Sequence, residues 1–165
     1  MSAKIDDILA AARHHCDEVI RPGVDGWNAT RKWPRAASDK AAALGLLGLY
    51  APAEWGGQGL SLGDGIRVYE ELGKGDGAYA FALSMHNICT FAVCGFGSEA
   101  LKRDWARDLT TGRKLANFSL TEPQSGSDAS TMYSRARING DGTWTINGAK
   151  AWVSLAGEAD IYLTV

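Results

Sequence analysis

The segment FSLTEPQSGSDAS, residues 118–130, marks the point at which the chain changes from one kind of structure to another. An apolar run typical of a β-strand stops at Thr121, and a turn rich in Ser and Gly follows. Pro123 fixes its own φ, and Gly126 allows the backbone to approach another molecule closely. Taken alone, such a segment is most often an ordinary surface turn. The alternative is a loop at a strand end that holds a ligand.

The residues before this segment carry the signals of helices. Apolar residues at helical spacing predict a first helix over residues 4–20, which stops before Pro22 and Gly23. Further helices are predicted from residues that open or cap a first turn. These signals are Pro34, Ser61 with Asp64, Asp76, and Ser98.

The segment GAYAFALSMHNICTFAVCGFG, residues 77–97, has the length to span a lipid bilayer. However, His86 and Asn87 lie in its middle, and its small residues favour close packing between helices. The segment therefore predicts a buried core helix rather than a membrane span, and no membrane partner is expected.

From Leu115 onward the periodicity changes to that of β-strands, and the turn sequence Asn139–Gly142 predicts a hairpin. Helices followed by strands favour a multi-domain, α+β chain. The sequence thus predicts an N-terminal all-α helical domain over residues 1–114 and an antiparallel, β-barrel-like domain over residues 115–165. The strand-like runs are LANFSLT, YSRARIN, TWTIN, KAWVS and DIYLTV.

The chain ends at Val165, inside an apolar strand-like run. A sheet that stopped there would present an unpaired apolar edge, which promotes aggregation. About 50 residues of β structure also make a thin core for a separate domain. We therefore expect the β domain to be incomplete, or to be completed by another chain.

Charge and cysteine content exclude several classes of protein. A net charge of −2 gives no basis for a nucleic-acid partner. Three Cys cannot all pair with one another, which favours reduced thiols and a cytoplasmic protein. The N-terminus, MSAKIDDILAAARHHCDEVI, has early acidic residues and no uninterrupted apolar stretch, so no signal peptide is expected.

The histidines give little support for nucleophilic or metal catalysis. His14 and His15 point to different sides of the predicted first helix and are expected at the surface, whereas His86 is expected in the core. No His and Cys have the spacing of a metal site, and no glycine-rich phosphate loop follows a strand. We therefore expect neither a metal nor a nucleophilic triad.

The run KAWVS, residues 150–154, could complete a ligand site with the opening segment. On a strand, Trp152 and Ser154 would share a face. The indole could pack against a flat ring while the hydroxyl reaches a polar ring atom. Thr121 and the neighbouring main chain could meet the edge of the same ring. The two segments together suit an aromatic heterocycle with polar edges.

The segment LTEPQSGSD resembles the signature of the acyl-CoA dehydrogenase family, a hydrophobic residue followed by T-E-P-x-x-G-S-D. TINGAKAWVSLAG is similar to the family segment NGxKxWITNG. The family's helical region resembles two earlier segments of this chain, YAPAEWGGQGLSLGDGIRVYEELGKGDG and SMHNICTFAVCGFGSEALKRDWARDLTTGRKLANFSLTEP. The resemblance begins at about residue 40. It implies an N-terminal helical domain, a middle β domain and a C-terminal four-helix domain, the last of which is absent from these residues.

The resemblance implies an FAD-dependent dehydrogenase that introduces an α,β double bond into an acyl-CoA thioester and passes electrons to an electron-transfer flavoprotein. It also implies a homo- or hetero-oligomer. The positions that it assigns to the flavin are Phe118, Leu120, Thr121, Ser127, Trp152, Val153 and Ser154, and those that it assigns to the acyl-CoA are Ser127, Met85 and His86.

The chain also departs from the family pattern. Ser154 stands where the family usually has Thr, and Leu155 and Ala156 replace the usual Asn-Gly, so this turn is expected to differ. The family's catalytic base is a Glu in the C-terminal domain, which would lie beyond Val165. No catalytic residue is therefore expected in this chain, which should be inactive alone. Glu122 is expected to stabilise its turn rather than to act as the base.

Two other functions stay open at this stage. One is a flavin-dependent monooxygenase or nitroalkane oxidase built on the same fold, and the other is a non-catalytic half that needs a partner chain. The complete T-E-P-x-x-G-S-D run and Trp152 favour the dehydrogenase.

Overall fold

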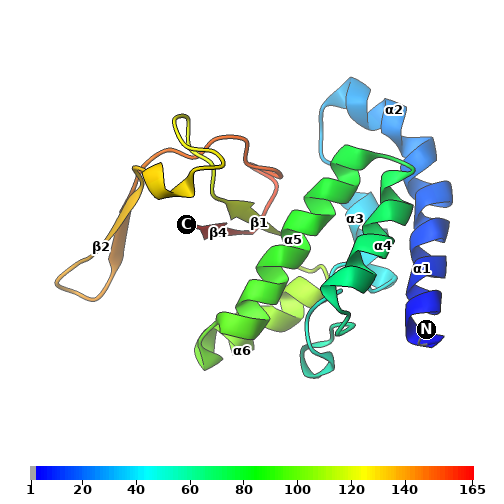
Figure 1. Cartoon of the computed structure of the whole chain (residues 1–165), viewed down its shortest axis with the longest axis horizontal. Coiled ribbons are helices and arrows are strands. Elements are labelled where there is room, and N and C mark those ends of the chain that lie inside the picture. The colour runs from blue at the N-terminus through cyan, green and yellow to red at the C-terminus, as the bar shows by residue number, and fades with distance from the viewer. Residues whose placement is uncertain (1–2) are drawn as a thin grey trace.

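The computed structural model describes residues 3–165 and shows a helical part followed by a smaller β part (Figure 1). The helical elements are α1 (Ala3–His15), the π-helix η1 (Cys16–Ile20), α2 (Arg21–Thr30), α3 (Arg35–Ala43), the 3-10 helix η2 (Ala53–Trp55), α4 (Leu62–Gly73), α5 (Gly77–Phe96) and α6 (Glu99–Thr110). The β part contains β1 (Ala116–Ser119), the 3-10 helix η3 (Ala129–Thr131), β2 (Arg135–Ile138), β3 (Trp144–Asn147) and β4 (Ile161–Thr164). The hairpin of β2 and β3 reaches away from the helices (Figure 1).

The predicted N-terminal caps of α4, α5 and α6 are confirmed. The Ser61 side chain accepts a hydrogen bond from the N–H of Asp64 at 3.1 Å. Asp76 accepts from the N–H of Tyr79 at 2.6 Å, and Ser98 caps α6 in the same way. These caps satisfy donors that a helix cannot pair internally, so they fix where each helix begins.

The predicted end of the first helix is wrong. The chain does not leave the helix before Pro22 but continues through η1 and α2 to Thr30 (Figure 1). The N–H of Arg21 donates to the carbonyl of Cys16, which is the wider spacing of a π-helix. Pro22 consequently lies in the first turn of α2, where its missing N–H costs little.

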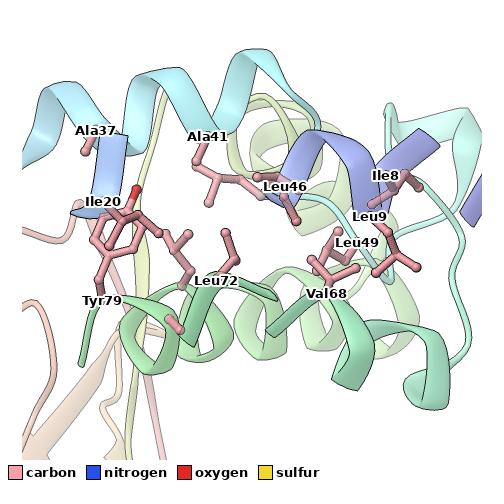
Figure 2. Close-up of a cluster of buried hydrophobic side chains, with 14 of the residues drawn as sticks. Ile8, Leu9, Ile20, Ala37, Ala41, Leu46, Leu49, Val68, Leu72 and Tyr79 are labelled. Carbon is pink, nitrogen blue, oxygen red and sulfur yellow. The ribbon is translucent and has the colours of Figure 1, made fainter. Parts of the chain in front are cut away.

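The largest apolar core joins α1, α3, α4 and α5 (Figure 2). At one end of this core, Trp27 and Trp33 each stack on Tyr79, with ring centroids 5.4 Å and 5.3 Å away. This stacking fixes α2 and the segment that follows it to the beginning of α5. The residues labelled in Figure 2 are Ile8, Leu9, Ile20, Ala37, Ala41, Leu46, Leu49, Val68, Leu72 and Tyr79.

Within residues 115–165, the β part consists of two separate pairs of strands that do not close into a barrel. The predicted hairpin is confirmed, since β2 and β3 are antiparallel and Asn139 N–H donates to Thr143 O at 2.7 Å. In contrast, β1 and β4 are parallel, with Ala116 opposite Ile161. The prediction of antiparallel pairing throughout is wrong because a long crossover separates these strands.

Asp160 ties the start of the β part to the helical part. Its carboxylate accepts from the N–H of Leu115 at 2.8 Å and lies 3.2 Å from the Lys114 ammonium. Arg35 of α3 lies 3.5 Å from the same carboxylate and donates to the carbonyl of Gly112 at 3.1 Å. The beginnings of β1 and β4 are therefore held together beside α3.

Helix α5 is long and apolar enough to cross a membrane by length and composition, and more than half of its apolar stretch is buried inside the fold. It contacts α4, α6 and β1. This burial agrees with the predicted core helix.

Candidate functional site

The turn after β1 is built around Glu122. The main chains of Glu122 and Ser125 exchange hydrogen bonds of 2.8 Å and 3.1 Å. The Glu122 carboxylate accepts from the N–H groups of Tyr133, at 2.6 Å, and Ser134, at 2.9 Å. The Ser125 hydroxyl donates to the carbonyl of Asp128 at 2.7 Å. The turn thus folds back on itself and encloses its own carboxylate.

A buried ion pair joins this turn to a later segment. Lys150 Nζ lies 2.8 Å from Glu122 Oε1 and donates to the carbonyl of Leu120 at 3.1 Å. The side chains of Lys150 and Glu122 are only 12% and 1% exposed. Lys150 first of all, and then Ser134, hold the pKa of the Glu122 carboxyl far below its usual range through hydrogen bonds. A carboxylate held ionised in this way is a poor general base, which agrees with the expected turn-stabilising role.

The segment that carries Trp152 is not a strand, so the prediction that Trp152 and Ser154 share one strand face is wrong. Trp152 has a φ of 56°, in the left-handed region, which interrupts the alternation of a strand. The main chain still reaches the end of β1, because the N–H of Ala151 donates to Thr121 O at 2.8 Å. We call this meeting of Thr121 and Ala151 the junction. The indole of Trp152, the next residue, is 91% exposed.

Unpaired donors gather at the same junction. Within residues 3–165, the main-chain N–H groups of Leu120 and Thr121 have no hydrogen-bond partner, and neither has the hydroxyl of Thr121 or Ser154. Leu120, Thr121 and Ser154 are half-buried. Main-chain donors beside an exposed indole fit a flat heterocycle with acceptors on its edge, such as the ring of a flavin.

The other residues assigned to the flavin have different surroundings. Phe118 is half-buried and packs on the small core that contains Cys89 and Val93, so its ring is part of the contact between β1 and α5. Val153 is half-buried and Ser127 is exposed on the turn. The roles of these residues toward a flavin stay predictions.

His86 lies in the core, as the sequence pattern suggested. Its Nδ1 accepts from the N–H of Ala116 at 3.0 Å, and its Nε2 lies 3.1 Å from the carbonyl of Leu109. The ring therefore joins α5 to the end of α6 and to β1. Met85, the neighbouring residue, is half-buried. Contact of either side chain with an acyl group, which the family resemblance implied, stays a prediction.

The structure favours a drop in stability at mildly acidic pH. The prediction that His15 lies at the surface is wrong, because its ring is fully buried 3.0 Å from the Tyr79 hydroxyl. Burial lowers the pKa of both His15 and His86 from 6.5 to about 4. Between these values the unfolded chain binds more protons than the folded chain, so folding stability is complete above pH 6.5 and is lost as the pH falls toward 4. Urea unfolding at a series of pH values should show the midpoint falling across this range. A midpoint independent of pH between 6.5 and 4 would contradict the assignment.

Lys150 is the site residue that sequence reasoning missed. Lys150 is the first residue of the predicted strand KAWVS, and a Lys at such a position is expected to point to solvent. The available signal was its position within the apolar run AKAW, together with an unpaired acid, Glu122, in the preceding motif.

Cysteine and metal chemistry have little support in the described part of the chain. Cys16, Cys89 and Cys94 are buried and free. Residues 3–165 contain no cluster of His, Cys, Asp or Glu that could hold a metal ion. The site instead offers hydrogen-bond donors and an aromatic face.

Two family models match consecutive parts of the chain, the first over the helical part and the second over the part that contains the Glu122 turn. The family model described as "Acyl-CoA dehydrogenase, N-terminal domain" matches residues 2–113, and that described as "Acyl-CoA dehydrogenase, middle domain" matches residues 117–165. The chain belongs to the acyl-CoA dehydrogenase family.

Several curated relatives are similar over most of the chain. Isobutyryl-CoA dehydrogenase of Bos taurus is 36% identical over 146 residues, which are 88% of this chain and 35% of the relative. The short-chain specific acyl-CoA dehydrogenase of Megasphaera elsdenii is 35% identical over 161 residues, which are 95% of this chain and 42% of the relative. The chain therefore spans less than half the length of these relatives.

Solved structures agree with the fold. Butyryl-CoA dehydrogenase from Megasphaera elsdenii is 33% identical with a TM-score of 0.89, over 99% of this chain and 44% of that chain. A complex of glutaryl-coenzyme A dehydrogenase with glutaryl-CoA is 32% identical with a TM-score of 0.91, over 99% of this chain and 42% of that chain. The FAD complex of PigA is 29% identical with a TM-score of 0.88, over 99% of this chain and 43% of that chain.

Proposed function

We propose that this chain forms the FAD-binding edge of an acyl-CoA dehydrogenase that acts on a short acyl-CoA. The observation that carries the proposal is the junction of Thr121 with Ala151, where unpaired main-chain donors lie beside the exposed indole of Trp152. The FAD complexes among the solved relatives support the choice of cofactor.

The residues of this chain would position the cofactor rather than carry out the proton transfer. Bound FAD would supply the hydride acceptor. The N–H groups of Leu120 and Thr121 would hold the edge of the ring, Trp152 would cover part of it, and the Ser154 hydroxyl would offer one more hydrogen bond. The proton acceptor would come from outside these residues, because Glu122 is already fully engaged with Lys150.

A short acyl chain without a second carboxylate is the proposed substrate, with isobutyryl-CoA as the first to test. Isobutyryl- and butyryl-CoA dehydrogenases are among the similar proteins. A glutaryl-CoA dehydrogenase is similar as well, but the glutaryl group carries a carboxylate that needs a cationic partner when buried. Helix α5, which holds Met85, has no charged residue along its length and so offers no such partner. The proposed electron acceptor is an electron-transfer flavoprotein, as the resemblance implied.

The proposal is tested by titrating the chain with FAD and following the visible flavin absorbance that stays with the protein after gel filtration. A yellow, discrete species is expected, and addition of isobutyryl-CoA should perturb its flavin spectrum more than addition of glutaryl-CoA. A chain that stays colourless at saturating FAD would contradict the proposed cofactor site. A colourless aggregate would instead support a non-catalytic half that needs a partner chain.

We expect no turnover from these residues alone. Measured with isobutyryl-CoA and an artificial electron acceptor, the FAD-loaded chain should show no acceptor reduction above background, because the acid next to the proposed flavin edge, Glu122, is already paired with Lys150. Sustained reduction by the purified chain would disprove this.

The fold also hosts proteins whose names do not mention acyl-CoA, such as PigA. A monooxygenase or nitroalkane oxidase is therefore the second candidate. Stopped-flow reoxidation separates the two, because rapid reaction of the reduced flavin with O₂ would favour an oxygen-using enzyme over the dehydrogenase.

A further inference from the structure

The two segments assigned to the flavin meet through very few contacts. Strand β1 pairs with β4, so no strand pairing joins the end of β1 to residues 150–154. The main chain provides one hydrogen bond, from the N–H of Ala151 to Thr121 O, at 2.8 Å. Lys150 provides the other link, because its ammonium donates to the carbonyl of Leu120 at 3.1 Å.

The Lys150 ammonium is enclosed and neutralised. It lies 2.8 Å from Glu122 and is also 3.5 Å from the sulfur of Met132. Glu122 in turn accepts from the main chain of Tyr133 and Ser134, so its carboxylate is fixed from two sides. A buried charge pair of this kind is held in one geometry, because burying either charge without its partner would strongly destabilise the fold.

From this geometry we propose that Lys150 is a positioning residue, which sets the spacing between the main-chain donors at Leu120 and Thr121 and the indole of Trp152. Lys150 is two residues before Trp152, and its ammonium reaches the last residue before Thr121. Glu122 masks the Lys150 charge, so the proposed flavin edge lies next to a pair without net charge. The inference rests on the proposed flavin site and adds a residue that the family resemblance did not assign.

A double variant separates two effects of Lys150 on FAD binding, its positioning of the two segments and its charge. Lys150→Met removes the link and leaves Glu122 buried without its partner, whereas Glu122→Gln combined with Lys150→Met removes both charges. Lys74→Met is the matched control, because Lys74 lies 2.6 Å from Glu71 in a surface pair and is 56% exposed. All three proteins are compared with the parent chain by circular dichroism, FAD titration and amide hydrogen exchange at Ala151.

If Lys150 positions the site, both variants that lack it should exchange the Ala151 amide faster and bind FAD more weakly. Loss of a charged hydrogen bond predicts a weakening of roughly tenfold to hundredfold. Lys74→Met should match the parent in both measurements. The double variant should recover the helical signal if Lys150→Met loses it, but it should not recover FAD affinity.

Two results would overturn the proposal. In the first, the double variant binds FAD as tightly as the parent. In the second, FAD affinity falls while the Ala151 amide stays as protected as in the parent, which would assign the effect to charge instead of position. A parent chain that binds no FAD would contradict the proposed function, while the exchange at Ala151 would still decide whether Lys150 holds the two segments together.

Discussion

Replacing His86 by Ala is expected to lower the free energy of unfolding by about 3–5 kcal/mol, the range typical of large-to-small changes in a core. His86 is fully buried, and its ring bonds the N–H of Ala116 at 3.0 Å and the carbonyl of Leu109 at 3.1 Å. The variant would leave a cavity and would remove the partner of the Ala116 N–H and of the Leu47 carbonyl, which lies 3.2 Å from the same ring. Urea unfolding followed by circular dichroism at neutral pH measures the change.

The control for this prediction is His14→Ala. His14 is exposed on α1, so its removal should change the free energy of unfolding by no more than about 0.5 kcal/mol. Equal unfolding midpoints for the His86 and His14 variants would show that the ring of His86 does not hold α5, α6 and β1 together.

Trp152→Ala should weaken FAD binding by roughly tenfold to hundredfold, which corresponds to the loss of one stacked aromatic contact. Because the indole is 91% exposed, the variant should fold as well as the parent chain. Thr121→Ala should weaken binding less, since the main-chain N–H at this position remains. FAD titration followed by flavin absorbance or fluorescence measures both effects.

Trp144→Ala provides the matched control for Trp152. Trp144 is also an exposed indole, 64% accessible, but it lies on the β2–β3 hairpin away from the junction of Thr121 and Ala151. Its removal should leave FAD affinity unchanged. Unchanged affinity in both the Trp152 and Thr121 variants would place the flavin elsewhere or remove it from this chain.

Local signals in the sequence predicted the helical part well. Ser61, Asp76 and Ser98 cap their helices as predicted, because a cap depends on a side chain and the main chain of the next turn. The core position of His86 could also be predicted, because a single polar ring in a long apolar helix is usually paired inside the fold.

The failures have separate physical causes. Pro22 is an ordinary helix stop in sequence, and only the π turn before it makes the position acceptable. The run KAWVS has strand composition, yet Lys150 is bound by Glu122 and Trp152 takes a left-handed φ. The parallel pairing of β1 and β4 depends on the whole crossover between them, which no local pattern describes.

The parallel pairing of β1 and β4 also has a consequence for the order of folding. The hydrogen bond from Leu115 to Asp160 spans a sequence separation of 45 residues. Contacts of this range close a long loop, so they lose more chain entropy and form more slowly than contacts between neighbouring helices. We expect α4 and α5 to associate first and β4 to dock last. The flavin edge would then be completed only in the final stage of folding, when Ala151 reaches Thr121 on a surface that the helices have already formed.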